Sequence, residues 1–234
     1  MPPLPQSPPN EVGKTTKGSG LFAETFMKIN LVVSREYDQN AYCCFDPEAK
    51  EGVIIDPGLN CDGIVSFLNA EQINVKAILL THGHYDHILS ARRISDYTKA
   101  DLCAHRMEVP VLEDPAVNLS IMRDVEKMSL HMDKLLEDGD EIHFGKEVFR
   151  VIHTPGHTPG GVCYYNEREK TIFTGDTMFW ESIGRADLPL SDGQELTRSI
   201  KEKLLILPGD TTVYPGHGRP TDINHETMIH RRIE

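Results

Sequence analysis

Short apolar runs that end in turn residues alternate with amphipathic stretches along most of the chain. In the first half, β-prone runs predict strands at Phe26–Val33, Asn40–Phe45, Gly52–Asp56, Val75–Leu80 and Asp101–Ala104. Helices are predicted at Cys61–Ala70, where Ile64, Phe67 and Leu68 have the spacing of a helix face, and at Ile88–Tyr97. Three strands therefore come first, and helices are interspersed with strands after them.

The second half repeats this alternation. Further strands are predicted at Glu141–Phe144, Glu147–His153, Gly161–Tyr165, Lys170–Thr174 and Thr211–Tyr214. An amphipathic helix is predicted at Gln194–Leu205, whereas Met107–Glu137 has no clear period and is expected to form short helices or loop cover. Strands with helices interspersed throughout favour a layered α/β sandwich.

The chain begins differently. Five of its first nine residues are proline, and residues 11–20 are polar and rich in glycine. Such a segment buries too little apolar surface to fold, so residues 1–20 are expected to be a disordered tail and residues 21–234 a single domain. The tail has no apolar stretch of the kind that a signal peptide carries.

Composition excludes several classes of protein. Lys and Arg number 24 against 36 Asp and Glu, so the net charge of −12 argues against a nucleic-acid partner. No stretch approaches the ~18 apolar residues of a membrane span, which argues against a membrane protein. The five cysteines are odd in number and form no C-x-x-C pair. They are expected to be reduced, and we therefore expect a cytoplasmic location.

Histidine is the unusual component, with 11 residues concentrated in loops that follow apolar strands. The segment from His82 to His87 reads His-Gly-His-Tyr-Asp-His. In extended chain its first two histidines point to the same side, and Asp86 and His87 follow in a turn. This segment can therefore offer ligands to two neighbouring points in space.

Three further loops have the same character, each with His or Asp beside Gly just after a strand. They are Thr154-Pro155-Gly156-His157-Thr158, Thr174-Gly175-Asp176-Thr177 and Pro215-Gly216-His217-Gly218. Glycine allows the backbone to approach a ligand closely. Seven such groups at four strand ends are better explained by a metal centre than by chance polar loops.

This set of motifs resembles that of the metallo-β-lactamase-fold hydrolases, and most closely their glyoxalase II-like (hydroxyacylglutathione hydrolase-type) branch. Ile54-Ile55-Asp56-Pro57-Gly58 is similar to the first motif of that family, and the loop Ser182–Pro189 is similar to one in small bacterial members. The resemblance implies an αββα fold, in which two mixed β-sheets lie face to face with helices outside.

The resemblance also implies a site with two divalent cations per chain. In that pattern His82, His84 and His157 hold the first cation, and Asp86, His87 and His217 the second. Asp176 bridges both cations together with a hydroxide. Asp86 and Asp176 are the carboxylates that the resemblance assigns to catalysis, and Asp56 orients a ligand histidine. Zinc accepts this ligand mixture, and iron or manganese are also compatible with it.

The function implied is metal-dependent hydrolysis, most specifically of a small-molecule thioester by the bridging hydroxide. A thiol has a pKa near 8.5 and leaves without a dedicated acid. Arg185 matches a basic position that contacts a substrate carboxylate. Full-length glyoxalase II-type enzymes carry a further helical domain that helps to bind glutathione, for which the residues after His217 leave no room. We therefore expect the hydrolytic centre and leave the use of glutathione open.

Other classes remain as alternatives. The first is a mononuclear iron persulfide dioxygenase of the same fold, with His82, His157 and Asp176 as its iron ligands. A nuclease needs a basic groove, which the charge disfavours, and a secreted β-lactamase is disfavoured by Asp176 and by the missing signal peptide. An electron-transfer diiron protein would have Glu in place of His84. A non-catalytic binding module would not need all seven positions filled.

Overall fold

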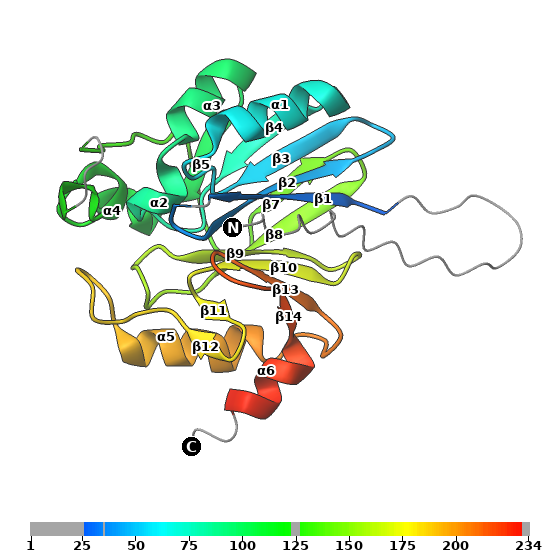
Figure 1. Cartoon of the computed structure of the whole chain (residues 1–234). Helices are drawn as coiled ribbons and strands as arrows, with labels where there is room; N and C mark the ends of the chain where they lie inside the picture. Colours follow the sequence, from blue (N-terminus) through cyan, green and yellow to red (C-terminus); the bar gives the residue numbers. More distant parts are fainter. Residues whose placement is uncertain (1–25, 35, 123–126, 231–234) are drawn as a thin grey trace, which may run out of the picture.

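The computed structural model describes residues 26–34, 36–122 and 127–230 and consists of two six-stranded sheets packed face to face (Figure 1). The predicted tail at residues 1–20 lies outside the described residues. The first sheet has the order β1-β2-β3-β4-β5-β6 and the second the order β14-β13-β10-β9-β8-β7. Both sheets are mixed, because each contains parallel and antiparallel pairs, such as β3 with β4 and β10 with β13 (parallel), β1 with β2 and β8 with β9 (antiparallel).

The strands of the first sheet are those expected, with one addition. They are β1 (Lys28–Ser34), β2 (Gln39–Asp46), β3 (Glu51–Ile55), β4 (Asn74–Leu79), β5 (Asp101–His105) and β6 (Lys134–Leu136). The sixth strand lies in the segment for which no period was found, since three residues are too few to show one. It pairs in parallel with β5 and forms an edge of the sheet.

The second sheet also contains every expected strand. It is formed by β7 (Glu141–Phe144), β8 (Glu147–His153), β9 (Val162–Asn166), β10 (Thr171–Gly175), β13 (Thr212–Pro215) and β14 (Thr221–Asp222). Between β10 and β13 the chain forms a small hairpin of β11 (Met178–Phe179) and β12 (Ser182–Ile183). The pattern of the sequence did not predict the two-residue strands, for the same reason of length.

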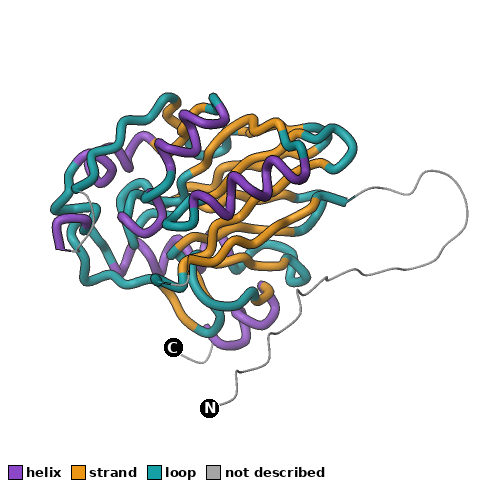
Figure 2. The backbone as a smooth tube through the Cα atoms, turned by 45° about the horizontal axis from the view of Figure 1, so that its top comes forward, coloured by secondary structure: helices purple, strands orange, loops and turns teal. Residues whose placement is uncertain are grey.

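Helices cover the two outer faces. In Figure 1, α1 (Cys61–Glu71) and α3 (Ala91–Thr98) lie on the first sheet, while α5 (Gly193–Ser199) and α6 (Ile223–His230) lie on the second. Figure 2 shows the strands in the middle and helices on both sides. The helix expected at Ile88–Tyr97 is two helices, α2 (Tyr85–Ile88) and α3. The helix expected at Gln194–Leu205 is α5 followed by a π-helical turn, η3 (Ile200–Leu204).

The remaining helices are short. They are η1 (Arg106–Glu108), α4 (Val109–Glu113) and η2 (Ser120–Met122), which agrees with the short helices or loop cover expected for Met107–Glu137. In Figure 1, α4 lies at one end of the sandwich. Within the described residues no helix is long and apolar enough to cross a membrane. All five cysteines are free and buried.

Three layers of apolar side chains hold the sandwich together, as an αββα arrangement requires. Ile64 of α1 and Ile94 of α3 pack on the outer face of the first sheet. Leu79 and Phe149 belong to the core between the sheets. Leu196 of α5 packs on the outer face of the second sheet. The fold predicted from the sequence is therefore the fold observed, and the rigid core leaves the loops at the strand ends to carry the chemistry.

Candidate metal centre

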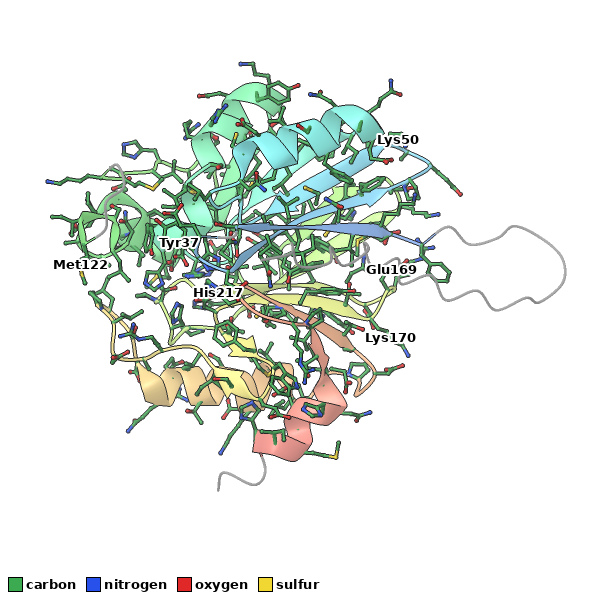
Figure 3. All side chains as sticks on the ribbon, viewed as in Figure 1. Tyr37, Lys50, Met122, Glu169, Lys170 and His217 are labelled. Carbon is green, nitrogen blue, oxygen red and sulfur yellow. The ribbon has the colours of Figure 1, made fainter. Side chains whose placement is uncertain are left out.

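The four loops singled out in the sequence meet at one edge of the sandwich. The first follows β4, the second joins β8 to β9, the third follows β10 and the fourth follows β13. The first loop belongs to one sheet and the other three to the second sheet, so both sheets supply side chains. Figure 3 shows His217, from the fourth loop, at the level where the two sheets meet.

His82, His84 and His157 form one cluster, in which one ligand-type nitrogen from each ring lies within 4.8 Å of the others. All three side chains are buried. Nδ1 of His84 lies 3.0 Å from Nε2 of His157, and Nε2 of His82 is buried without a hydrogen-bond partner among the described residues. Three buried nitrogens that face one point form a suitable site for a cation.

Asp86, His87 and His217 form a second cluster of the same size. Nε2 of His217 lies 3.3 Å from Oδ2 of Asp86 and 3.3 Å from Nε2 of His87. His87 is fully buried, whereas His217 and Asp86 are partly exposed. The second cluster is therefore the more open of the two to solvent and to a substrate.

Asp176 lies between the two clusters. Its Oδ1 atom is 3.3 Å from Nε2 of His87 and 3.7 Å from Nε2 of His217, while its Oδ2 atom is 3.6 Å from Nε2 of His157. Oδ1 is buried and has no hydrogen-bond partner in the described part of the chain. One carboxylate thus turns one oxygen to each cluster.

Three of the imidazole rings are held in a defined orientation, because Nδ1 of each ring contacts an oxygen atom outside the two clusters. Nδ1 of His157 donates to the main-chain oxygen of Arg185 at 2.8 Å, and Nδ1 of His217 donates to that of Asp38 at 3.1 Å. Nδ1 of His87 faces Oδ2 of Asp56 at 2.9 Å. Because a ring that donates from Nδ1 has its lone pair on Nε2 when neutral, all three are oriented as ligands.

Burial and charge set the protonation of the site. Burial lowers the pKa of His82 well below its usual value and that of His84 to about 3, so both rings are neutral. Burial also disfavours a charged His87, but the carboxylates of Asp176 and Asp86 outweigh it and raise the pKa of His87 well above its usual value. Burial alone would raise the pKa of Asp176. The nearby His87 outweighs this effect and holds the pKa of that carboxyl well below its usual range.

A proton on His87 therefore balances part of the negative charge of the second cluster. Cations compete with protons for imidazole ligands, so a divalent cation can take over this role. The neutral rings of His82 and His84 in the first cluster and the carboxylate of Asp86 in the second are donors that such cations prefer.

The loop that carries His217 is fixed by Asn40, the second residue of β2. Nδ2 of Asn40 donates to the main-chain oxygens of Pro215 at 3.0 Å and of Gly218 at 2.9 Å. The main-chain nitrogen of Asn40 donates to the main-chain oxygen of Gly216 at 2.8 Å. Asn40 was not identified from the sequence, because nothing in its local pattern separates it from the other residues of its strand.

Arg185 lies beside the site mainly through its main chain. Its guanidinium is exposed and donates from Nε and Nη2 to the two carboxylate oxygens of Asp187, both at 2.9 Å. The side chain is therefore engaged within its own loop, while the carbonyl oxygen holds His157. The sequence motif predicted a role for the side chain of Arg185, but it gave no sign that the carbonyl oxygen of this residue orients His157.

The other histidines lie outside the two clusters. His105 and His153 stack at 3.9 Å, and Nε2 of His153 donates to the main-chain oxygen of Pro159 at 2.9 Å. Rings of His131, His143 and His225 pair with glutamates on the surface.

Comparison with known proteins gives a consistent family. A model described as the metallo-beta-lactamase superfamily matches residues 39–217. The hydroxyacylglutathione hydrolase GloC of Haemophilus influenzae is 31% identical over 207 residues, which cover 86% of this chain and 95% of that protein.

Two solved structures extend the likeness. BLEG-1, described as a B3 metallo-beta-lactamase, superposes with a TM-score of 0.80 at 38% identity and covers 87% of this chain and 97% of its own. TTHA1623, solved in a di-iron-bound form, superposes with a TM-score of 0.74 at 34% identity and covers 85% of this chain and 96% of its own. The relatives thus match along nearly their whole length.

Proposed function

The chain belongs to the metallo-beta-lactamase superfamily, and from this premise we propose that it is a hydrolase that uses two divalent cations to cleave a small-molecule thioester. The observation that carries the proposal is the position of Asp176, whose two oxygens face the two clusters. In this proposal His82, His84 and His157 hold one cation, Asp86, His87 and His217 hold the other, and Asp176 contacts both.

The residues fit such a pair of cations. Nε2 of His82 and Oδ1 of Asp176 are buried polar atoms without a partner among the described residues, which is costly unless a ligand satisfies them. Each cluster alone offers three donors, and a catalytic zinc site uses three protein ligands with one position left open. Zinc suits this donor set, and the di-iron form of TTHA1623 supports iron as a second choice.

Bound cations would supply Lewis acidity, which makes water at the site more acidic and stabilises negative charge on a carbonyl oxygen. The chain contributes orientation. Asp56, the carbonyl of Arg185 and the carbonyl of Asp38 keep Nε2 of His87, His157 and His217 directed inward. The partly exposed side of the second cluster, with Asp86 and His217, is where a substrate would approach.

The chemistry of the leaving group favours a thioester. A thiol has a pKa near 8.5, so a thiolate can leave at neutral pH without being protonated. An alkoxide is a much stronger base and needs an acid to leave. All seven candidate side chains are committed to the clusters, so none is left over as that acid. The name of the Haemophilus relative, a hydroxyacylglutathione hydrolase, supports the same substrate class.

The test combines metal analysis with a substrate panel. Protein purified without added metal is expected to contain about two divalent cations per chain and to hydrolyse thioesters faster than β-lactams, lactones and phosphodiesters. One iron per chain, no hydrolysis and oxygen uptake with glutathione persulfide would replace the proposal with the dioxygenase alternative. Faster cleavage of β-lactams than of thioesters would replace the substrate class.

A further inference from the structure

Glu108 is a buried carboxylate that none of the sequence motifs includes. It ends η1, immediately before α4, and its side chain is fully shielded from solvent. A carboxylate in such a position is costly unless hydrogen bonds satisfy it. Its contacts therefore indicate what the residue does.

Both oxygens of Glu108 accept hydrogen bonds from the loops of the candidate metal centre. Oε1 accepts from the main-chain nitrogen of Gly83 at 2.7 Å, and Oε2 accepts from that of Gly160 at 2.8 Å. Gly83 lies between His82 and His84, and Gly160 is three residues after His157. One side chain thus connects the two loops that supply the first cluster.

The two glycines allow this arrangement because they have no side chain. A Cβ atom at position 160 would collide with the main-chain nitrogen of Glu108, and one at position 83 would lie 3.0 Å from side-chain atoms of Val111 and Leu112. The backbone of η1 therefore lies directly on the loop of Gly160, and side chains of α4 pack on the loop of Gly83. The contact is a built feature of the fold and not a chance approach of one flexible side chain.

We propose that Glu108 is a positioning residue for the cation held by His82, His84 and His157, an inference that rests on the proposed metal centre. The loops come from different sheets, and Nδ1 of His84 must lie near Nε2 of His157, 3.0 Å away, for both to contact one ion. Glu108 fixes this spacing because each of its oxygens accepts a hydrogen bond from the main chain of one loop.

A second link between the loops suggests that loss of Glu108 is tolerated by the fold. The main-chain nitrogen of Val162 donates to the oxygen of Thr81 at 2.9 Å, independently of Glu108. Substitution of Glu108 should therefore loosen the spacing of the histidines without separating the sheets. The second cluster has no hydrogen bond to Glu108 among those described, so it should change less.

The experiment compares Glu108→Gln and Glu108→Ala with the native protein in a titration of Zn²⁺ against a chelator. A glutamine can accept from one glycine only, because its amide nitrogen faces the other N–H, and alanine accepts from neither. We expect the affinity of one of the two zinc sites to fall about tenfold to a hundredfold in Glu108→Gln and further in Glu108→Ala, as for other groups that orient metal ligands. The same titration of Asp86→Ala, which lacks a residue of the second cluster, identifies the weakened site.

Glu147→Gln is the matched control. Glu147 is also buried, accepts from Asn166 and Arg168, and begins β8 at the end remote from the loop of His157. It should leave both zinc affinities unchanged even where it lowers the melting temperature. Equal loss at both sites in Glu108→Gln, or no loss at either, would overturn the inference.

Two further results separate the possible failures. If the native protein binds no zinc or iron, the proposed function fails and the inference with it, whereas native binding with an unaffected Glu108→Gln removes the inference alone. If both Glu108 variants fail to fold, hydrogen exchange of the native metal-free protein decides. The amides of Gly83 and Gly160 should then be protected to a similar degree, and rapid exchange of either one would contradict a link through Glu108.

Discussion

The imidazole of His87 and the carboxylate of Asp56 form a buried pair, with 2.9 Å between Nδ1 and Oδ2 and no more than 2% of either side chain exposed. Oδ1 of Asp56 accepts from the main-chain nitrogen of Thr81 at 2.7 Å, and Oδ2 accepts from its hydroxyl at 2.6 Å. Asp56 is therefore fixed on both oxygens. It in turn fixes the ring of His87, whose Nε2 faces Asp176 and His217.

Asp56→Asn should weaken the second cation site selectively. The substitution keeps the shape of the side chain but removes the negative charge that orients and polarises His87. We expect the zinc affinity of the site of Asp86, His87 and His217 to fall about tenfold to a hundredfold. Chelator titration with the native protein as reference measures this change.

Asp46→Asn is the control for the loss of a buried aspartate. Asp46 is as buried as Asp56 and accepts main-chain hydrogen bonds from Glu48 and Lys146, but it ends β2 on the side away from the metal loops. It should lower thermal stability without changing either zinc affinity. If Asp56→Asn behaves in the same way, Asp56 has no part in orienting His87.

Asp176→Ala should reduce activity far more than stability. Asp176 is the only one of the seven candidate residues with an oxygen facing each cluster, so its removal takes a ligand from both cations. We expect turnover of a thioester to fall by about two orders of magnitude or more, comparable to the loss of other strong transition-state contacts. Metal content should fall below two per chain, with a change in melting temperature of only a few °C.

The comparison is made in kcat, metal content and melting temperature on one preparation. A variant that keeps both metals and normal turnover would show that Asp176 does not bridge the site. A variant that unfolds at room temperature would show that its main contribution is to the fold.

Much of this architecture could be predicted from the sequence, because strands and turns leave local patterns. The apolar runs before His82, His157, Asp176 and His217 indicated strand ends, and strand ends of one sandwich meet at few places. The two clusters contain the residues that the family resemblance assigned to them.

Glu108 and Asn40 could not be found in this way. Glu108 contacts Gly83 and Gly160, which are 25 and 52 residues away, and Asn40 contacts Pro215 at a separation of 175 residues. Their importance arises from packing between distant segments, and neither residue stands in a motif of its own. The short strands β11 and β14 were missed because two residues contain no period.

His105 should make the protein less stable in mild acid. Burial, with a smaller effect of stacked His153, lowers the pKa of His105 to about 4, while Asp138 and Asp140 act in the opposite direction. Its unfolded pKa is near 6.5. As the pH falls from about 6.5 to 4, the unfolded state takes up a proton that the folded state resists, so stability is lost across this range.

His105→Asn should remove this pH dependence. In the native protein Nδ1 of His105 accepts a hydrogen bond from the main-chain nitrogen of Met107 at 3.3 Å, and the asparagine side chain keeps an acceptor for it. The drop in melting temperature between pH 7 and pH 5 should be smaller in the variant by about 2–4 °C. Because the metal-site histidines are common to both proteins, their titration cancels in the comparison. An identical drop in both proteins would show that His105 contributes nothing to the acid sensitivity.

The exposed pair of Arg185 and Asp187 bears on the choice of substrate. Both of their side chains are mostly exposed, 68% and 71%, and such pairs contribute little to stability because solvent competes for them. A carboxylate on a substrate can therefore replace Asp187 as the hydrogen-bond acceptor of the Arg185 guanidinium. Arg185 is close enough to matter, because its own carbonyl oxygen holds His157.

Arg185→Ala should raise KM for thioesters that carry a carboxylate and leave kcat nearly intact, since an interaction made equally with substrate and transition state affects binding alone. Asp187→Ala should lower KM for the same substrates, because it frees the guanidinium. A neutral thioester should respond to neither variant. Arg198→Ala, which removes an exposed arginine paired with Glu195 on α5, is the control and should change no kinetic constant. Equal losses on charged and neutral substrates in Arg185→Ala would mean that the side chain supports the loop around His157 and does not bind the substrate.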